Sequence, residues 1–216
     1  MNFIRRPLKY SNFGAVYWLI GINILIFAAM RFLGDQFSNN MVTRMAMIPL
    51  GIVQFKMYWT FVTYMFLHGS ITHILFNMLG LFIFGIHVER QMGSREFLLY
   101  YFVTGTLAGV FSFCVYYFTD NYFIALMGAS GALFAVELAY AVFFPDSIVY
   151  IWGILPLRAP VMVLGFTALE LFFALSGGGR GNVAHLTHLA GFAFGWIYFM
   201  LRFGISPMKR LIGRQR

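Results

Sequence analysis

The sequence predicts an all-α membrane protein in which six transmembrane helices form one bundle. Of the 216 residues, 61% are hydrophobic and 10% are charged, whereas soluble domains carry about 25% charged residues. So few polar groups cannot cover a water-soluble surface, and lipid must therefore solvate much of the chain. The apolar residues form long runs without the alternating polarity of a barrel strand, which favours helices.

Six apolar runs mark the expected helices. Some are shorter than the ~20 residues that a lipid-exposed helix needs, but flanking residues can extend them and short helices can stay buried among neighbours. The runs are Tyr17–Phe32, Ile74–Val88, Phe97–Phe118, Ala125–Phe144, Pro160–Gly177 and His188–Phe203. We expect a single membrane domain over residues 1–216, with its core at about 15–203 and a short basic tail at each end.

The connection between the first two runs, residues 33–72, is long and contains the apolar segment Met57–Leu67. Eleven residues are too few to cross a bilayer as a helix. We expect this first outer loop to be membrane-associated, with the segment lying in the outer interface. An ordinary loop that packs on the bundle explains the same pattern equally well.

Positive charges predict the orientation of the bundle. With six spans, one side of the membrane holds 11 Lys and Arg residues, in both tails and in the second and fourth loops, and the other side holds four. The positive-inside rule then places both termini in the cytoplasm. The net charge of +8 is explained in this way and does not indicate a nucleic-acid partner. We expect a bacterial inner membrane, which a short chain with six spans and no targeting extension suits.

Polar side chains, which are costly inside a membrane bundle and usually functional, gather near the start of the second, fourth and sixth runs. These three helices all descend from the outer face, so Ser130, His73, Asn77 and His188 are expected at similar depth. A serine hydroxyl needs a base such as imidazole to become a nucleophile. Side chains of Asn and His can donate hydrogen bonds to an oxyanion, and His73 and Asn77 share one helix face.

Glycines favour a close approach of the fourth and sixth helices. Gly128 and Gly131 flank Ser130, while Gly191 and Gly195 form a small-xxx-small face on the helix of His188. Small residues let helix backbones pack closely in membranes. This packing would bring the serine and the histidine within hydrogen-bond reach.

These elements together resemble the motifs of the rhomboid family of intramembrane serine proteases. The resemblance covers about residues 15–203, in the right order along the chain. The matching elements are Gly128-Ala129-Ser130-Gly131 for GxSG, His73 to Asn77 for HxxxN, His188-Leu189-Ala190-Gly191 with Gly195 for the HxxG helix, and Glu89, Gly93 and Ser94 for an ExxxGS turn.

The resemblance implies a mechanism and a class of substrate. Ser130 would be the nucleophile and His188 the base, in a dyad without a third acidic member. His73, Asn77 and the Ser130 backbone N–H would bind the oxyanion. The substrates would be transmembrane segments of other proteins, cut near the outer surface after a small residue, without a metal or cofactor.

Several residues need separate interpretation. Phe134 stands where some family members have Tyr, and its i+4 spacing from the serine predicts that its ring stacks on His188. His185 shares a helix face with His188, but the glycine spacing favours His188 as the base. We expect Glu137 and Glu170 to be protonated or hydrogen-bonded structural groups near a water-filled cavity. The family position of Glu89 implies that it ties the second loop to neighbouring backbone.

Three other functions fit the sequence less well. A non-enzymatic relative that binds membrane clients would lack the serine or the histidine, and this chain keeps both. A metal or haem protein could use His68, His73, His185 and His188, but no cysteine or carboxylate cluster in the sequence completes such a site. A transporter would be expected to show internal repeats, which the spans lack. Oligomeric state and the identity of the substrate are not predicted.

Overall fold

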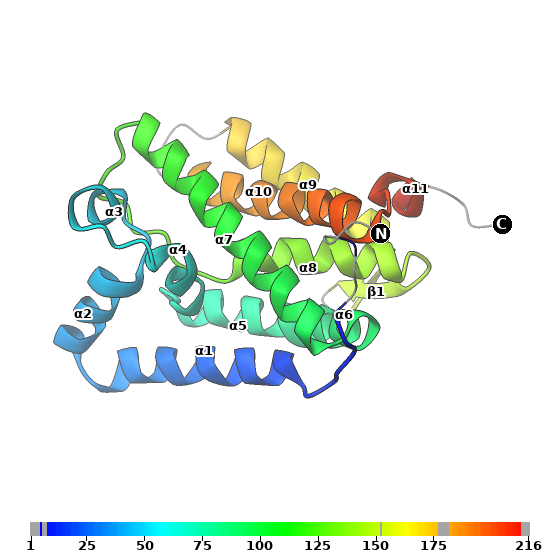
Figure 1. Cartoon of the computed structure of the whole chain (residues 1–216), viewed down its shortest axis with the longest axis horizontal. Coiled ribbons are helices and arrows are strands. Elements are labelled where there is room, and N and C mark those ends of the chain that lie inside the picture. The colour runs from blue at the N-terminus through cyan, green and yellow to red at the C-terminus, as the bar shows by residue number, and fades with distance from the viewer. Residues whose placement is uncertain (1–4, 6–7, 152, 177–181, 213–216) are drawn as a thin grey trace.

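The computed structural model describes residues 5, 8–151, 153–176 and 182–212. It is a helical bundle in which α7 crosses diagonally over α5, α8 and α10 (Figure 1). The helical elements are α1 (Ala15–Phe32), α2 (Asp35–Met45), α3 (Pro49–Phe55), α4 (Thr60–Thr63), η2 (Tyr64–Phe66), α5 (Ile71–Gly80), η3 (Leu81–Gly85), α6 (Ile86–Met92), α7 (Ser94–Phe118), α8 (Ser130–Phe143), α9 (Ala159–Ser176), α10 (Asn182–Tyr198), η4 (Phe199–Phe203) and α11 (Pro207–Ile212).

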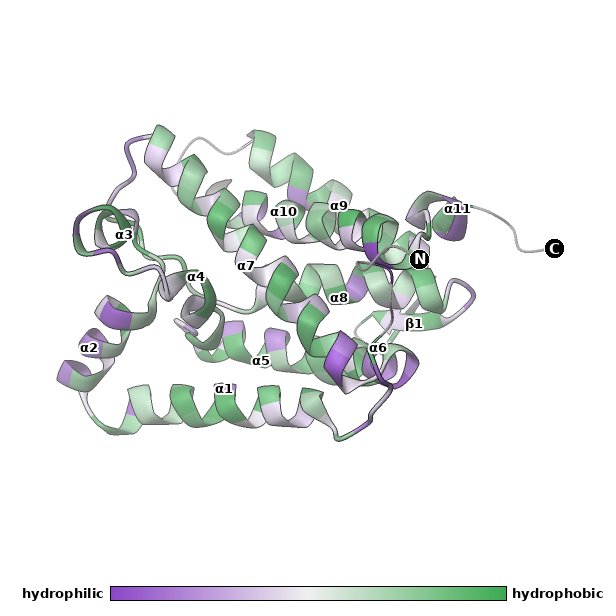
Figure 2. Cartoon of the chain, viewed as in Figure 1, coloured by the Kyte–Doolittle hydropathy of each residue, from purple (hydrophilic) through white to green (hydrophobic). Residues whose placement is uncertain are grey.

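Among the described residues, four helical stretches are long and apolar enough to cross a membrane: α1, the continuous helix Ile71–Met92, α7 and α9. Helix α8 is apolar but has only 14 residues. Apolar residues colour most of these helices, whereas polar residues concentrate in α2 and near the junction of α6 and α7 (Figure 2). The long, apolar helices agree with the predicted fold class.

Some predicted boundaries were wrong. The fourth run was expected to begin at Ala125, but α8 begins at Ser130 because an extended segment precedes it. The sixth run was expected to begin at His188, but α10 begins at Asn182. The fifth run was expected to end at Gly177, which lies outside the described residues.

A short hairpin between α8 and α9 departs from the expected all-α structure. Strands β1 (Ile148–Ile151) and β2 (Leu155–Arg158) pair antiparallel, with Ile148 opposite Arg158. Branched and aromatic residues in β1 favour extended backbone. Gly153 adopts a positive φ of 71° in the connecting turn, a conformation that suits glycine.

The first long loop folds into α2, α3, α4 and η2 at one end of the bundle, opposite the hairpin and α11 (Figure 1). Its later part packs on the bundle: Tyr64 is buried, and its hydroxyl donates to the Gly105 carbonyl at 2.7 Å. Tyr58 and Trp59, in contrast, are more than half exposed. The end of the apolar segment therefore packs on the bundle, and its start is open to the surroundings.

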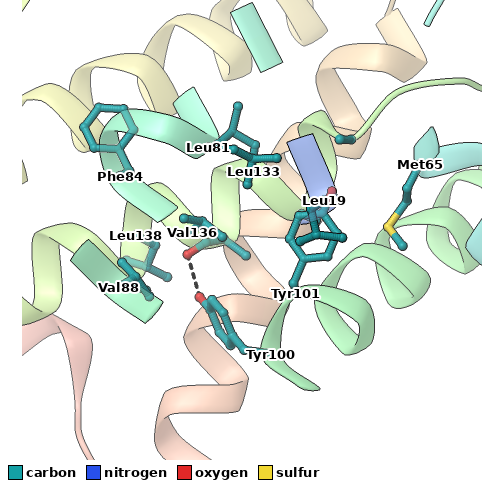
Figure 3. Close-up of a cluster of buried hydrophobic side chains, with 14 of the residues drawn as sticks. Leu19, Met65, Leu81, Phe84, Val88, Tyr100, Tyr101, Leu133, Val136 and Leu138 are labelled. Atoms are coloured by element: carbon teal, nitrogen blue, oxygen red, sulfur yellow. Dashed lines mark hydrogen bonds between the residues drawn. The ribbon is translucent and has the colours of Figure 1, made fainter. Parts of the chain in front are cut away.

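Helix α8 occupies the centre of the core, where ten of its 14 residues are buried. Side chains from α5 through α7 surround it, including Leu81, Phe84 and Tyr100 (Figure 3). The Tyr100 hydroxyl donates to the Ala135 carbonyl at 2.5 Å, which ties α7 to α8. The start of α8 is thus held by a well-packed frame.

Carboxylates fix the other end of the bundle. Glu89 accepts hydrogen bonds from the backbone N–H groups of Ala15 (2.6 Å) and Val16 (3.0 Å) and from the Ser94 hydroxyl. This contact with neighbouring backbone is the one that the resemblance implied. Glu96 pairs with Arg202 at 2.7 Å, which joins the start of α7 to η4.

Candidate active site

The segment before α8 is positioned by the first long loop. Leu126 forms a two-way backbone bridge with Met47 (2.9 and 3.1 Å), and the Gly128 N–H donates to the Tyr64 carbonyl at 3.0 Å. Gly128 has a φ of +122°, and a Cβ there would lie 2.5 Å from Nε2 of His73. Only glycine fits this position without displacing the histidine ring. Ser130 then begins α8.

Ser130 and His188 meet across the interface of α8 and α10. Their Oγ and Nε2 atoms lie 2.7 Å apart, a short hydrogen-bond distance. The Phe134 ring stacks on the imidazole with centroids 4.7 Å apart and an interplanar angle of 6°. This is the stacking predicted from spacing, and it restricts rotation of the histidine ring.

Glycines on α10 allow this meeting. A Cβ on Gly191 would lie 1.8 Å from the Gly131 carbonyl oxygen, so the two backbones are in direct contact. A Cβ on Gly195 would lie 2.6 Å from the Tyr100 hydroxyl and 3.0 Å from the Ala135 Cβ. The predicted close packing of the two helices is therefore present, and it depends on the missing side chains.

His73 and Asn77 line the same cavity as Ser130 and His188. The Ser70 hydroxyl caps α5 by accepting the His73 N–H at 3.1 Å, which fixes the first turn of that helix. The Asn77 amide nitrogen donates one hydrogen to the His73 carbonyl at 2.9 Å. Its second hydrogen is available for another acceptor.

His68 contacts the His73 ring but is not among the residues that line the cavity. The two rings make an edge contact with centroids 5.0 Å apart, and His68 is 1% exposed. Burial, with a smaller contribution from His73, lowers the pKa of His68 to about 4. His68 is therefore neutral at neutral pH.

Glu170 reaches His188, a contact that the sequence did not predict. Its Oε2 lies 2.6 Å from Nδ1 of His185 and 3.1 Å from Nδ1 of His188. The bond to His185 has good hydrogen-bond geometry, whereas the contact with His188 has an ion-pair distance without that alignment. A carboxylate therefore lies beside His188, a neighbour that the resemblance did not imply.

Glu170, His185 and His188 are also the residues that a metal site would use here. The ligand atoms of Glu170, His185 and His188 all lie within 4.8 Å of one another, so a carboxylate does accompany the histidines, contrary to the sequence interpretation. Two imidazoles and one carboxylate can hold zinc. However, the 2.6 Å contact is a hydrogen-bond distance, and this bond explains the cluster without an ion.

The cavity has a volume of about 890 Å³ and a mostly apolar wall. Helices α5, α8, α9 and α10 contribute to it, and so does strand β1 through Val149, Tyr150 and Ile151. Glu137, which is 7% exposed, lies in the cavity wall about two helical turns after Ser130, on the same face of α8. A large apolar pocket with a few converging polar groups is typical of a binding site for an apolar ligand.

Comparison with known proteins identifies a family and several relatives. The Rhomboid domain model matches residues 56–205. The rhomboid protease GlpG of Haemophilus influenzae is 35% identical over 147 residues, which cover 67% of this chain and 71% of that protein. The mitochondrial RHOMBOID-like protein 12 of Arabidopsis thaliana is 28% identical, with 89% of this chain and 61% of that protein aligned. The rhomboid protease GluP of Bacillus subtilis is 30% identical over 55% of this chain but only 22% of its own length.

The match extends from the first long loop to just beyond η4, so it includes each of the motifs quoted above. Together with the long apolar helices, it makes the chain an integral membrane protein. This chain belongs to the rhomboid family.

Proposed function

We propose that this chain is an intramembrane serine endopeptidase that cuts transmembrane segments of other membrane proteins. The observation that carries the proposal is the 2.7 Å contact between Ser130 Oγ and His188 Nε2 in the wall of a large cavity. Membership of the rhomboid family, and relatives that are named rhomboid proteases, support the same activity.

The proposed reaction follows from the two side chains. Ser130 Oγ attacks the scissile carbonyl carbon while His188 Nε2 takes the hydroxyl proton, which gives a tetrahedral oxyanion. His73, the second amide hydrogen of Asn77 and the Ser130 backbone N–H stabilise that oxyanion. The C–N bond breaks as His188 returns the proton to the leaving amine. Water then attacks the acyl-enzyme by the same route, and the serine is restored.

The shape of the site supports a substrate that arrives from lipid. An apolar wall suits a segment that has left the bilayer, and a segment that unwinds at the membrane surface could present an extended peptide bond to Ser130. A small residue before the cut fits an approach beside Gly128 and Gly131. No metal or cofactor is part of this proposal.

The proposed placement keeps the orientation that the sequence predicts. Six spans form a single domain over residues 1–216 in a bacterial inner membrane. Both termini are cytoplasmic, the site opens to the outer side, and the first long loop associates with the outer interface. The positive charges of the tails and of the second and fourth loops support this orientation.

The test is cleavage of fluorescently labelled single-span proteins by the purified chain in liposomes. Wild type should cut, whereas Ser130→Ala and His188→Ala should lose at least about 10³-fold in rate. His185→Ala should keep substantial activity. Cleavage by Ser130→Ala at the parent rate would contradict the proposal. Binding of the substrates without any cleavage by wild type would instead favour a client-binding relative without enzymatic activity.

A further inference from the structure

Glu170 is the one charged residue of helix α9, all of which the structure describes, and apolar packing does not explain its position. Helix α9 has four buried residues among 18, and all four lie in its first five positions. Glu170 lies beyond this buried part, yet its side chain is only 18% exposed because it turns toward α10. There its carboxylate meets two imidazoles, as described above. A carboxylate inside a bundle is costly unless it has partners.

The contact with His188 has a direct chemical meaning. A neutral imidazole carries one proton, and a neighbouring carboxylate favours that proton on the nearer nitrogen. Oε2 of Glu170 lies 3.1 Å from Nδ1, and its negative charge favours the proton on that nitrogen even though the contact lacks hydrogen-bond alignment. Nε2 is then an acceptor, and the Ser130 hydroxyl can donate to it across 2.7 Å. This is the tautomer that a general base needs.

We propose that Glu170 is a positioning residue that holds His188 in its base-competent tautomer and stabilises the imidazolium formed during acylation. The inference rests on the proposed proteolytic function. It leaves the proposed serine–histidine pair as the reacting groups and adds one carboxylate beside the histidine in this chain. Glu170 does not contact the substrate in this account, and it acts through His188 alone.

His185 has a supporting part in the same arrangement. Its Nδ1 forms a hydrogen bond to Oε2 of Glu170 at 2.6 Å, and its ring packs against Phe173 with centroids 5.4 Å apart. Phe173 lies one turn after Glu170 on α9. His185 therefore fixes the carboxylate relative to α10, and its loss should weaken the effect of Glu170 without abolishing it.

The experiment measures how fast a fluorophosphonate probe labels Ser130 in detergent-purified protein. This small probe reports nucleophile activation without requiring a known protein substrate. Glu170→Gln should slow labelling about ten- to a hundred-fold, as part of the ~10²–10⁴ that a positioned base contributes. A glutamine amide can donate to Nδ1 and so favour the wrong tautomer. Glu170→Asp should recover part of the rate, and His185→Phe should lose only a few-fold.

The matched control is Thr167→Val, one turn earlier on α9, where the hydroxyl only bonds back to the Val163 carbonyl. It should label at the parent rate. With a single-span substrate, Glu170→Gln should lower kcat and leave KM nearly unchanged. Melting curves give the folded fraction of each variant, and labelling rates are compared per folded molecule. If Glu170→Gln is unstable, Glu170→Asp is used for the same comparison.

The outcomes separate this inference from the proposed function. If Glu170→Gln and Glu170→Asp both label at the parent rate per folded molecule while Ser130→Ala does not label, Glu170 has no positioning role and the protease proposal stands. If Ser130→Ala labels as fast as wild type, the proposed function itself fails. A rise in KM with an unchanged kcat would also overturn the positioning role.

Discussion

Helices α8 and α9 both line the cavity, but they are held in different ways. Ten of the 14 residues of α8 are buried, whereas four of the 18 residues of α9 are. Ser130 lies on the tightly packed helix, and His188 lies on α10, whose backbone touches that helix at Gly131. Glu170 lies on the loosely packed helix. Steric constraint therefore fixes Ser130 and His188, while the hydrogen bond to His185 contributes much of what fixes Glu170.

The largest expected effect comes from adding one methyl group where α8 and α10 touch. Gly191→Ala would place a Cβ 1.8 Å from the Gly131 carbonyl oxygen. Overpacking of a core typically costs about 1–3 kcal/mol, and a backbone clash of this severity should reach or exceed the upper value. Thermal unfolding in detergent should show a large loss of stability, with little Ser130 labelling.

Gly165→Ala on α9 is the matched control, because a Cβ there meets nothing within 4 Å. It should be neutral or slightly stabilising, by up to about 1 kcal/mol, since alanine favours helix. If Gly191→Ala and Gly165→Ala unfold at the same temperature, the proposed difference in packing between the α8–α10 contact and helix α9 is wrong.

A pair of leucine truncations sharpens the same comparison. Leu138 on α8 is fully buried, whereas Leu171 on α9 is 49% exposed. Leu138→Ala should cost about 2–5 kcal/mol because it leaves a cavity, and Leu171→Ala should cost less than about 1 kcal/mol. Denaturant or thermal unfolding in the same detergent measures both, and equal costs would count against a rigid α8.

The smallest expected effect is the pH dependence of stability that comes from His68, in the loop between η2 and α5. Folded His68 stays neutral down to a pKa of about 4, whereas an unfolded histidine takes up a proton below about pH 6.5. Its contribution to stability is therefore complete above about pH 6.5 and is lost as the pH falls toward 4. Between pH 7 and pH 5 the loss should be about 2 kcal/mol.

His68→Phe keeps a ring in this position but cannot titrate. Its melting temperature should fall less than that of the parent between pH 7 and pH 5. Parallel falls for parent and variant would mean that His68 is not held neutral, and that this loop is less well packed than the rest of the region around α8.

Much of the site could be predicted from sequence because its motifs are formed by residues that lie close together along the chain. The spacing from His73 to Asn77, the glycines around Ser130 and the spacing from His188 to Gly195 are all features of single helices. Topology then placed these helices at one depth, and the structure brings Ser130 and His188 together. The stacking of Phe134 also followed from its spacing along one helix.

Other features depend on contacts between elements and left no local signal. Glu170 meets His185 and His188 from a different helix, and no periodicity encodes which side of α9 faces α10. The start of α10 was missed because its first turns mix polar with apolar residues. The β1–β2 hairpin was missed because two four-residue strands are too short to stand out from a loop.

The most direct test of the central claim is to locate the covalent adduct of a fluorophosphonate probe by peptide mass spectrometry. The account predicts a single modified residue, Ser130, with labelling that His188→Ala reduces to background. An adduct on a different residue, or labelling of Ser130 at the parent rate in His188→Ala, would contradict the assignment of nucleophile and base.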